Sequence, residues 1–280
     1  MNANSQPKTP AIKDWLSSAS QQLREAEISS ARLDSEIILA NVLQKTRTYL
    51  HAHDTDTLSK NELKTANAHL KMRLNRIPVA YLTGYKDFYG RPFSVTTDTL
   101  IPRPESEDII TILKEKIASP RTNNKLIDVG TGSGCLGITA KLEIPDLDVT
   151  LTDISLAALA VAAQNAAALK ANVRTLQSDL LANYPYKANY IIANLPYVDI
   201  NWQCSPETKH EPSLALFADD SGLELIDRLI EQTDNHLTPG GLLLLESDTR
   251  QHAEIISKAK SRELLYVETR GLITCFSKPA

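Results

Sequence analysis

Residues 125–137 read KLIDVGTGSGCLG, the order expected of a short strand, a glycine-rich turn and the start of a helix. The apolar residues between Lys125 and Val129 suit a buried strand, and the glycines that follow let the backbone turn sharply and approach a ligand closely. Gly132, Gly134 and Gly137 also have the GxGxxG spacing of dinucleotide-binding loops, a match that is weak when taken alone. The stretch therefore predicts a ligand-binding loop at a helix N-terminus and leaves the ligand open.

Strand-like and helix-like stretches alternate through residues 105–280. This alternation predicts an α/β fold with a doubly wound, mostly parallel sheet, in which ligands bind at the carboxyl ends of the strands. The strand candidates are Lys125 to Val129, Val149 to Asp153, Val173 to Gln177, Tyr190 to Ala193, Gly241 to Glu246 and Leu265 to Thr269. The clearest helix candidates are Leu156 to Leu169 and Leu223 to His236. The residues that close each strand are therefore the candidate site residues.

Acidic residues stand at the ends of the first three strands. Asp128 precedes the glycines, Asp153 ends the second strand, and Ser178-Asp179-Leu180 follows the third. S-adenosylmethionine carries a cationic amino group, a sulfonium and a ribose diol but no phosphate, so carboxylates near the loop suit it better than they suit a pyrophosphate. We expect Asp128 at the cationic end, Asp153 on the ribose hydroxyls, and Asp179 with Leu180 beside the adenine. Asp153 would also suit NAD, and Asp153 and Asp179 could instead cap helices, as could Ser155.

The fourth strand ends in Asn194-Leu195-Pro196-Tyr197. An amide or exocyclic amine nitrogen is a poor nucleophile, so an enzyme that methylates it must hold its NH2 group with acceptors. The Asn194 side-chain oxygen and the Leu195 carbonyl could accept the two N–H bonds, Pro196 would stiffen the turn and Tyr197 could pack on the flat face. Such catalysis rests on positioning and electrostatics and needs no general base. The predicted catalytic and substrate-binding residues are Asn194, Leu195, Pro196 and Tyr197, and the predicted cofactor contacts are Gly130, Thr131, Gly132, Ser133, Gly134, Asp153, Asp179, Leu180 and Asn194.

Residues 11 to about 78 show helical patterns only. Apolar residues recur at helical spacing within 12–28, and again at Leu33, Ile37 and Ala40. In a third segment Ser59 and Glu62 have the spacing of a capping box, and an apolar stripe follows. Residues 79–104 then mix aromatic and β-branched residues with Gly and Pro. We expect a small helical domain over 1–78, a hairpin-like connector over 79–104 and the α/β domain over 105–280.

The amino-acid composition excludes several classes of protein. The 280 residues are 42% hydrophobic and 23% charged, which is ordinary globular usage. Three scattered cysteines without CxxC spacing predict neither a disulfide framework nor a metal site, and residues 1–10 lack a targeting pattern, so we expect a cytoplasmic protein without a membrane segment. Residues 1–90 hold 12 Lys and Arg against 9 Asp and Glu, whereas residues 91–280 hold 18 against 25. The acidic second part argues against direct nucleic-acid binding.

Further segments resemble the PrmC (HemK) family of protein-(glutamine-N5) methyltransferases, which modify peptide chain release factors. The similar segments are PVAYLTG (78–84), FYG (88–90) and LIPRPESE (100–107), together with Glu211-Pro212, Ala215-Leu216 and Gly222. The family's glycine loop corresponds to 130–134, its ribose acid to Asp153, its adenine-side pair to Asp179-Leu180 and its NPPY motif to 194–197. The resemblance implies a class I (Rossmann-like) S-adenosylmethionine-dependent methyltransferase, preceded by a helical domain that recognises the substrate.

The resemblance also implies the reaction, which is methyl transfer to the glutamine of a release factor's Gly-Gly-Gln motif by a protein that we expect to be monomeric. Leu195 stands where the family usually has Pro, Asp248 stands where Gly is typical, and residues 271–276 lack the usual Asp-Arg pair. These differences leave alternatives open. The chain could methylate a ribosomal protein glutamine or a nucleic-acid adenine, or it could be a non-catalytic S-adenosylmethionine-binding adaptor. The GxGxxG spacing also leaves an NAD-dependent oxidoreductase as an alternative.

Overall fold

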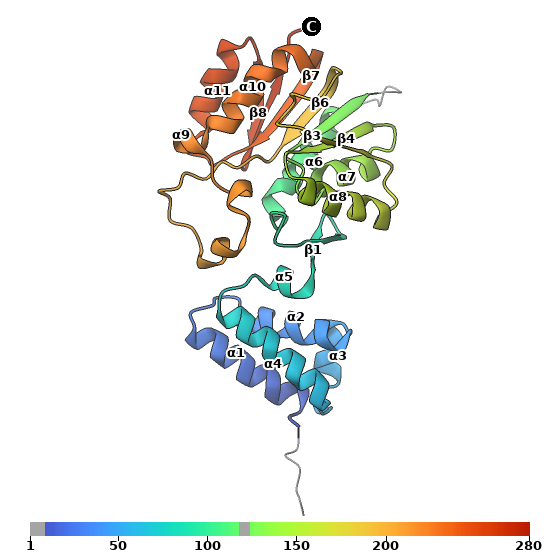
Figure 1. Ribbon diagram of the computed structural model, residues 1–280, viewed down its shortest axis with the longest axis vertical. Coiled ribbons are helices and arrows are strands. Elements are labelled where there is room, and N and C mark those ends of the chain that lie inside the picture. Colours follow the sequence, from blue (N-terminus) through green and yellow to red (C-terminus); the bar gives the residue numbers. More distant parts are fainter. Residues whose placement is uncertain (1–8, 118–123) are drawn as a thin grey trace, which may run out of the picture. The chain divides into compact units, whose positions relative to one another are not determined.

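The computed structural model describes residues 9–117 and 124–280 (Figure 1). The chain divides into two compact units between Gly84 and Tyr85, and each is described by itself. We expect no targeting sequence because of the composition of residues 1–10. Most of these residues lie outside the part of the chain that the structure describes. Among the residues that are described, no helix has the length and apolar character to cross a bilayer.

The first unit is helical. It contains α1 (Ile12–Glu25), α2 (Ala31–Leu43), α3 (Arg47–Ala52), α4 (Lys60–Leu74) and α5 (Val79–Thr83). The buried side chains of Trp15, Leu39 and Leu70 belong to its core. The predicted capping box is confirmed, because the Ser59 side chain accepts from the Glu62 amide and the Glu62 side chain accepts from the Ser59 amide. This reciprocal pairing fixes where α4 begins.

The stripe expected on α2 is wrong in part. Leu33 is 43% exposed, whereas the neighbouring Asp34 and Ser35 are buried. Asp34 Oδ2 accepts from Arg73 Nε of α4 at 2.7 Å, and the Ser35 hydroxyl lies 2.7 Å from that of Ser20. Polar side chains therefore occupy part of the buried face because each has a buried partner, which an apolar periodicity cannot reveal.

The second unit begins with a hairpin. Strands β1 (Tyr85–Phe88) and β2 (Arg91–Ser94) pair antiparallel through a turn in which Tyr89 and Gly90 have positive φ angles. Gly90 thus serves as the turn former that the sequence predicts. The hairpin leads through a 3₁₀ turn, η1 (Pro104–Ser106), into α6 (Glu107–Lys116).

A seven-stranded sheet forms the centre of this unit. Its strand order is β5-β4-β3-β6-β7-β9-β8, with β9 antiparallel to both neighbours and the strands from β5 to β7 parallel. The bounds are β3 (Lys125–Val129), β4 (Asp148–Asp153), β5 (Arg174–Gln177), β6 (Ala188–Ala193), β7 (Leu237–Glu246), β8 (Leu265–Arg270) and β9 (Ile273–Ser277). The predicted α/β fold with a doubly wound sheet is confirmed, and β9 is the strand that the sequence analysis missed.

Helices cover both faces of the sheet (Figure 1). Besides α6, the helices of this unit are α7 (Cys135–Glu143), α8 (Leu156–Ala168), α9 (Asp219–Gly222), α10 (Glu224–His236) and α11 (His252–Ser261), and the loops contain the short 3₁₀ turns η2 (Pro206–His210) and η3 (Ser213–Ala215). Leu126 of β3 belongs to a core with α6, α7 and α8, whereas the next residue, Ile127, belongs to a core with α10 and α11. Because both faces are buried, the central strands carry apolar side chains on both, with Asp128 and Thr152 among the buried polar exceptions.

Candidate active site

A cavity of about 650 Å³ lies at the carboxyl ends of β3, β4, β5 and β6. The strand order reverses between β3 and β6, which is where open α/β sheets bind ligands. The structure brings most of the sequence-predicted site residues to this cavity. Its lining includes Gly130, Thr131, Gly132, Ser133, Asp153, Asp179, Leu180, Asn194, Leu195 and Pro196. Gly134 and Tyr197 are not among the lining residues.

Asp128 does not line the cavity, so the expectation that it meets the cationic end of a ligand is wrong. It is fully buried beneath the glycine loop. Its Oδ2 atom accepts from Thr131 Oγ1 at 2.6 Å and from the Gly137 amide at 2.9 Å. Burial raises the pKa of this carboxyl to about 6, although both hydrogen bonds act to lower it. Asp128 therefore ties the loop to the first turn of α7.

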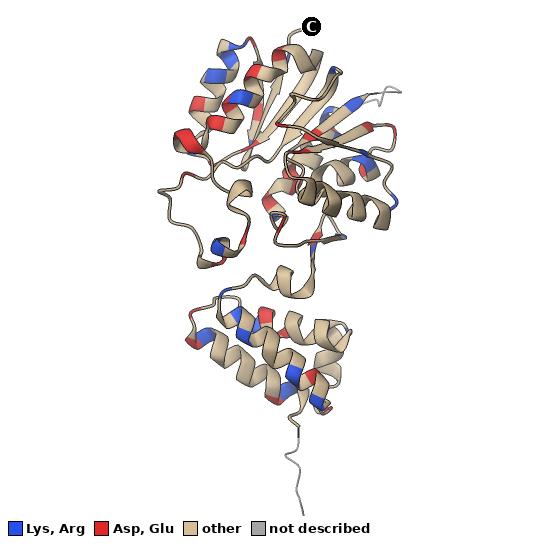
Figure 2. Ribbon diagram, viewed as in Figure 1, with Lys and Arg blue, Asp and Glu red and all other residues tan. Residues whose placement is uncertain are grey.

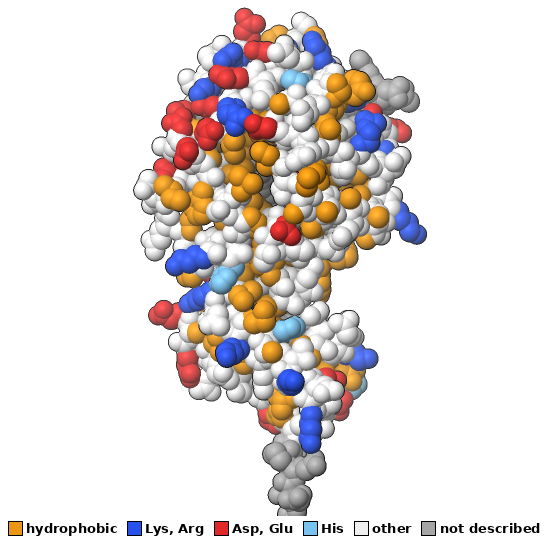
Figure 3. Space-filling view, in the orientation of Figure 1, with side chains coloured by type: hydrophobic (Ala, Val, Ile, Leu, Met, Phe, Trp, Pro, Cys, Tyr) orange, Lys and Arg blue, Asp and Glu red, His pale blue; other side chains and the backbone are white. Residues whose placement is uncertain are grey.

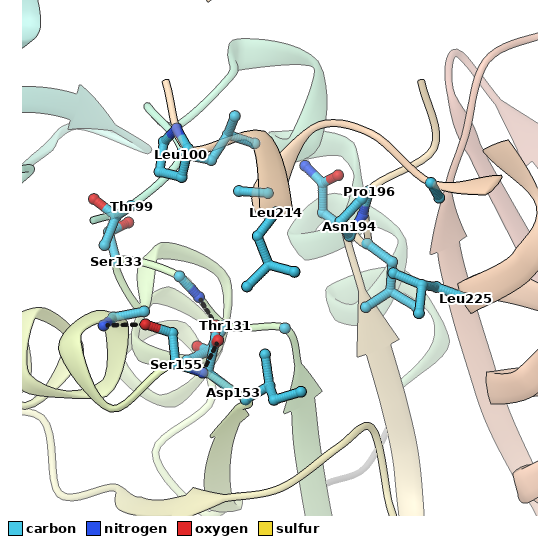
Figure 4. Close-up of a pocket in the computed structure, with 18 of the residues that line it drawn as sticks. Thr99, Leu100, Thr131, Ser133, Asp153, Ser155, Asn194, Pro196, Leu214 and Leu225 are labelled. Atoms are coloured by element: carbon cyan, nitrogen blue, oxygen red, sulfur yellow. Dashed lines mark hydrogen bonds between the residues drawn. The ribbon is translucent and has the colours of Figure 1, made fainter. Parts of the chain in front are cut away.

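Asp153 lies at the cavity surface, as expected, and supports the same loop. Its Oδ2 atom accepts from the Gly132 amide and its Oδ1 atom from the Ser155 amide, both at 2.9 Å. Burial raises the pKa of its carboxyl, and these amides oppose the shift. Ser155 caps α8, because its side chain accepts from the Ala158 amide at 3.2 Å (Figure 4). Asp153 is therefore not the helix cap, and its carboxylate, which has further lone pairs to offer, lines the cavity.

Asp179 and Leu180 line the cavity after β5. Residues 180–183 form a turn, so no helix begins there for Asp179 to cap. Asp179 Oδ2 pairs with Arg228 Nη2 of α10 at 2.6 Å. Leu180 is buried with a φ of 50°, a left-handed conformation that is uncommon for leucine. The structure thus places an acid and an apolar side chain together on this wall.

The segment after β6 forms another wall of the cavity, on the side away from Ser133 and Ser155 in the close-up (Figure 4). Asn194 Nδ2 donates to the Ser106 hydroxyl at 3.1 Å. Leu195 is buried, and its Cδ2 atom would lie 2.9 Å from a Cβ placed at Gly130. Glycine at 130 therefore leaves the room that Leu195 occupies. The Tyr197 hydroxyl donates to Glu246 Oε1 at 3.3 Å, and neither residue is among those that line the cavity.

Sequence reasoning missed Ser106 and Glu246. Ser106 precedes α6 and lines the cavity, and Glu246 ends β7 with an exposed fraction of 1%. Burial raises the pKa of the Glu246 carboxyl to about 7, against the hydroxyls of Ser106 and Tyr197, which lower it. The available signal was the position of Glu246 as the last residue of a predicted strand.

Two loops complete the wall. Residues 97–103 and 212–219 contribute lining side chains, among them Leu100, Leu214 and Phe217. Arg103 Nη2 pairs with Glu211 Oε1 at 2.6 Å, and Glu211 Oε2 accepts from the Ile101 amide at 3.2 Å. Glu211 therefore joins the two loops. Hydrophobic side chains also gather across the face of this unit in the space-filling view (Figure 3).

Comparisons with known proteins bear on both units. The family model described as the PrmC N-terminal domain matches residues 14–84, and the model described as the methyltransferase small domain matches residues 107–209. The release factor glutamine methyltransferase of Koribacter versatilis is 36% identical over 243 residues, covering 84% of this chain and 85% of that protein. The protein of the same name from Salmonella typhimurium is 35% identical over 246 residues, covering 86% and 87%.

The chain belongs to the release factor glutamine methyltransferase family. This confirms the resemblance seen in the sequence. Membership of an S-adenosylmethionine-dependent methyltransferase family also confirms the predicted cofactor.

Solved structures agree on the fold of this family member. A methyltransferase from Pyrococcus furiosus matches with a TM-score of 0.53 at 18% identity, covering 77% of this chain and all of that one. A ribosomal protein L11 methylase from Lactobacillus delbrueckii subsp. bulgaricus matches with a TM-score of 0.50 at 21% identity, covering 70% and 91%. Both likenesses show a shared methyltransferase fold.

The residues of this release factor glutamine methyltransferase family member fit S-adenosylmethionine. Gly132 has a φ of 53°, and a Cβ built on it would meet no atom within 4 Å, so the loop is open on that side. Asp153 supplies a carboxylate at the next strand end, and Leu180 supplies apolar surface. A cavity of this volume falls within the range of about 300–1,000 Å³ that holds small ligands. Among the described residues, no group of three or more His, Cys, Asp and Glu is placed to bind a metal.

Proposed function

We propose that the chain transfers a methyl group from S-adenosylmethionine to the side-chain amide nitrogen (N5) of the glutamine in the Gly-Gly-Gln motif of peptide chain release factors. The observation that carries this proposal is the placement of Asn194 and Leu195 in the same cavity as the glycine loop and Asp153. Family membership supports the choice of substrate.

The residues that would hold the cofactor follow from the cavity. The loop from Gly130 to Gly134 would lie against the methionine part, Asp153 would accept from the ribose hydroxyls, and Asp179 with Leu180 would adjoin the adenine. The support is that Asp153 lines the cavity and is kept in place by the amides of Gly132 and Ser155. S-adenosylmethionine supplies an electrophilic methyl group on a sulfonium that is also its own leaving group.

Asn194 and Leu195 would hold the target nitrogen. Asn194 gives its Nδ2 to Ser106, which leaves Oδ1 to accept one N–H of the glutamine amide. The Leu195 carbonyl would accept the other, and that group survives the replacement of the family's usual proline by leucine. Pro196 would limit the motion of the turn. Two acceptors that aim the nitrogen lone pair at the methyl group act by positioning, so no general base is required.

Tyr197 remains a predicted site residue, although, unlike Asn194 to Pro196, it is not among the residues that line the cavity. Its hydroxyl bonds to Glu246, and burial raises its pKa, so the phenol stays neutral. We infer that its ring packs against the flat face of the target amide.

The helical unit would recognise the release factor. The net charge of residues 1–90 is about +3 and that of residues 91–280 about −7 from the counts of charged residues. Lys and Arg positions are distributed along the helices of the first unit, with Asp and Glu positions among them (Figure 2). On this proposal residues 1–78 contact the partner, residues 79–104 connect and residues 105–280 catalyse, in a monomeric cytoplasmic enzyme.

Transfer of labelled methyl groups tests the proposal. The protein is incubated with labelled S-adenosylmethionine and a release factor, and the modified peptide is identified by mass spectrometry. A release factor with its Gly-Gly-Gln glutamine replaced by asparagine is the matched control. We expect label on that glutamine and none on the control. Absence of label where calorimetry shows cofactor binding would refute the proposal and leave the adaptor, whereas label in RNA or in a ribosomal protein would reassign the substrate.

A further inference from the structure

Glu246 is a buried carboxyl behind the cavity wall that the reaction as described leaves unused. It accepts from the Tyr197 hydroxyl at 3.3 Å. The Ser106 hydroxyl also faces it and favours its charged form. Arg103 and Glu105 act on it from the segment before α6, and the Cys135 thiol from α7. Its Oε2 atom is buried and has no hydrogen-bond partner among the described residues, so it is an acceptor toward which the Ser106 proton can turn.

Ser106 sits between Glu246 and Asn194. Its Oγ atom accepts from Asn194 Nδ2 at 3.1 Å. A hydroxyl has one proton, and it must go to a second partner while the oxygen accepts from the amide. The carboxylate of Glu246 can only accept, so it draws that proton away from Asn194. The Glu246 carboxylate thereby fixes which group donates and which accepts in the hydrogen bonds that run from Asn194 through Ser106 to Glu246.

We propose that Glu246 and Ser106 are positioning residues that hold the Asn194 amide in a single orientation, with Nδ2 toward Ser106 and Oδ1 toward the substrate. The amide of asparagine can otherwise rotate by half a turn and present a donor where the reaction needs an acceptor. A donor there would repel the N–H groups of the target glutamine. This inference rests on the proposed role of Asn194 in methyl transfer.

These hydrogen bonds from Asn194 through Ser106 to Glu246, which we call the relay, depend on pH because Glu246 can be protonated. Burial raises the pKa of Glu246 to about 7, helped by Glu105 and opposed by Arg103, Ser106 and Tyr197. Below that pH the protonated carboxyl can donate to Ser106 Oγ, which removes the fixed direction. The turnover number of the wild type should therefore rise through about pH 7, and the Glu246→Gln variant should lose this rise.

A double-mutant cycle on the full chain provides the test. The turnover numbers of Ser106→Ala, Asn194→Ala and the double variant are measured with S-adenosylmethionine and a release factor, beside the exposed controls Ser261→Ala and Glu254→Gln. We expect Ser106→Ala to lower turnover at least about tenfold, the size of one lost hydrogen bond to a polar partner, and Ser106→Thr to restore most of it. In the Asn194→Ala background the serine change should have no further effect.

Three results separate the possibilities. If Ser106→Ala lowers the turnover number by the same factor with and without Asn194→Ala, the relay is overturned. An unchanged pH profile of the turnover number in Glu246→Gln would overturn it too. Calorimetric affinity for S-adenosylmethionine and the thermal midpoint confirm that each variant is folded, and the serine cycle still decides if Glu246→Gln is not. A wild type that binds the cofactor but does not methylate the release factor would instead refute the proposed function, and this inference with it.

Discussion

Replacing Asp128 by asparagine should change how stability depends on pH. Asp128 is fully buried, and its Oδ2 atom carries the hydrogen bonds from Thr131 and Gly137. Asparagine keeps an oxygen at that position but cannot ionise. Its amide nitrogen takes the place of Oδ1, which has no hydrogen-bond partner among the described residues, and this adds a cost that does not vary with pH.

The magnitude follows from the pKa of Asp128, which burial raises from 3.8 to about 6. Because the folded state favours the neutral acid, its contribution to stability is complete below pH 3.8 and is lost as pH rises through about 6. At about 1.4 kcal/mol for each unit of pKa, the loss amounts to roughly 3 kcal/mol above pH 7. The free energy of unfolding of Asp128→Asn relative to the wild type should rise by up to that amount between pH 4 and pH 7.5.

Urea unfolding at several pH values between 4 and 7.5, followed by circular dichroism, measures this difference. The measurement is made without S-adenosylmethionine, because a ligand that binds the folded state adds its own stabilisation. Asp146→Asn, at an exposed position, is the matched control and should follow the wild type at every pH. A difference between Asp128→Asn and the wild type that stays constant with pH, or falls as pH rises, would refute the raised pKa of this buried carboxyl.

Three further variants probe the loop, the cofactor site and the wall. Gly137→Ala should lower the free energy of unfolding by about 1–3 kcal/mol in urea, because its Cβ would lie 2.3 Å from Leu151 Cδ2, and an unchanged midpoint would contradict the packing of α7 on the sheet. Asp153→Ala should weaken S-adenosylmethionine binding at least about tenfold in calorimetry, since it removes a charged acceptor, and an unchanged Kd would exclude the ribose contact. Arg103→Ala leaves the buried Glu211 carboxylate without its charged partner, so residues 197–218 should be cleaved faster in limited proteolysis, and equal rates would show that the pair does not hold the loop.

Much of the fold could be predicted from local patterns. The strand, glycine loop and helix around Lys125 to Gly137 are visible because a short apolar run, three glycines and a helical stretch follow one another. The capping box at Ser59 could also be predicted, because Ser59 and Glu62 have the required spacing. Strand β9 was missed because Ile273–Ser277 mixes polar and apolar residues, and only pairing with β7 and β8 identifies it.

The candidate site was predicted at the level of residue type rather than contact. The sequence places acids at strand ends, but only the structure shows that Asp128 turns under the loop while Asp153 faces the cavity. Ser106, Asn194 and Glu246 come from three distant segments, and their contacts depend on tertiary packing. Sequence reasoning from one chain cannot supply such pairings.

A structure of the protein with S-adenosylhomocysteine and a peptide that contains the Gly-Gly-Gln motif tests the central claim most directly. The account predicts that the glutamine amide nitrogen lies within about 3.2 Å of both Asn194 Oδ1 and the Leu195 carbonyl oxygen, with the Asn194 amide nitrogen still on Ser106. A glutamine amide that contacts neither oxygen, or an Asn194 side chain turned out of the cavity, would contradict it.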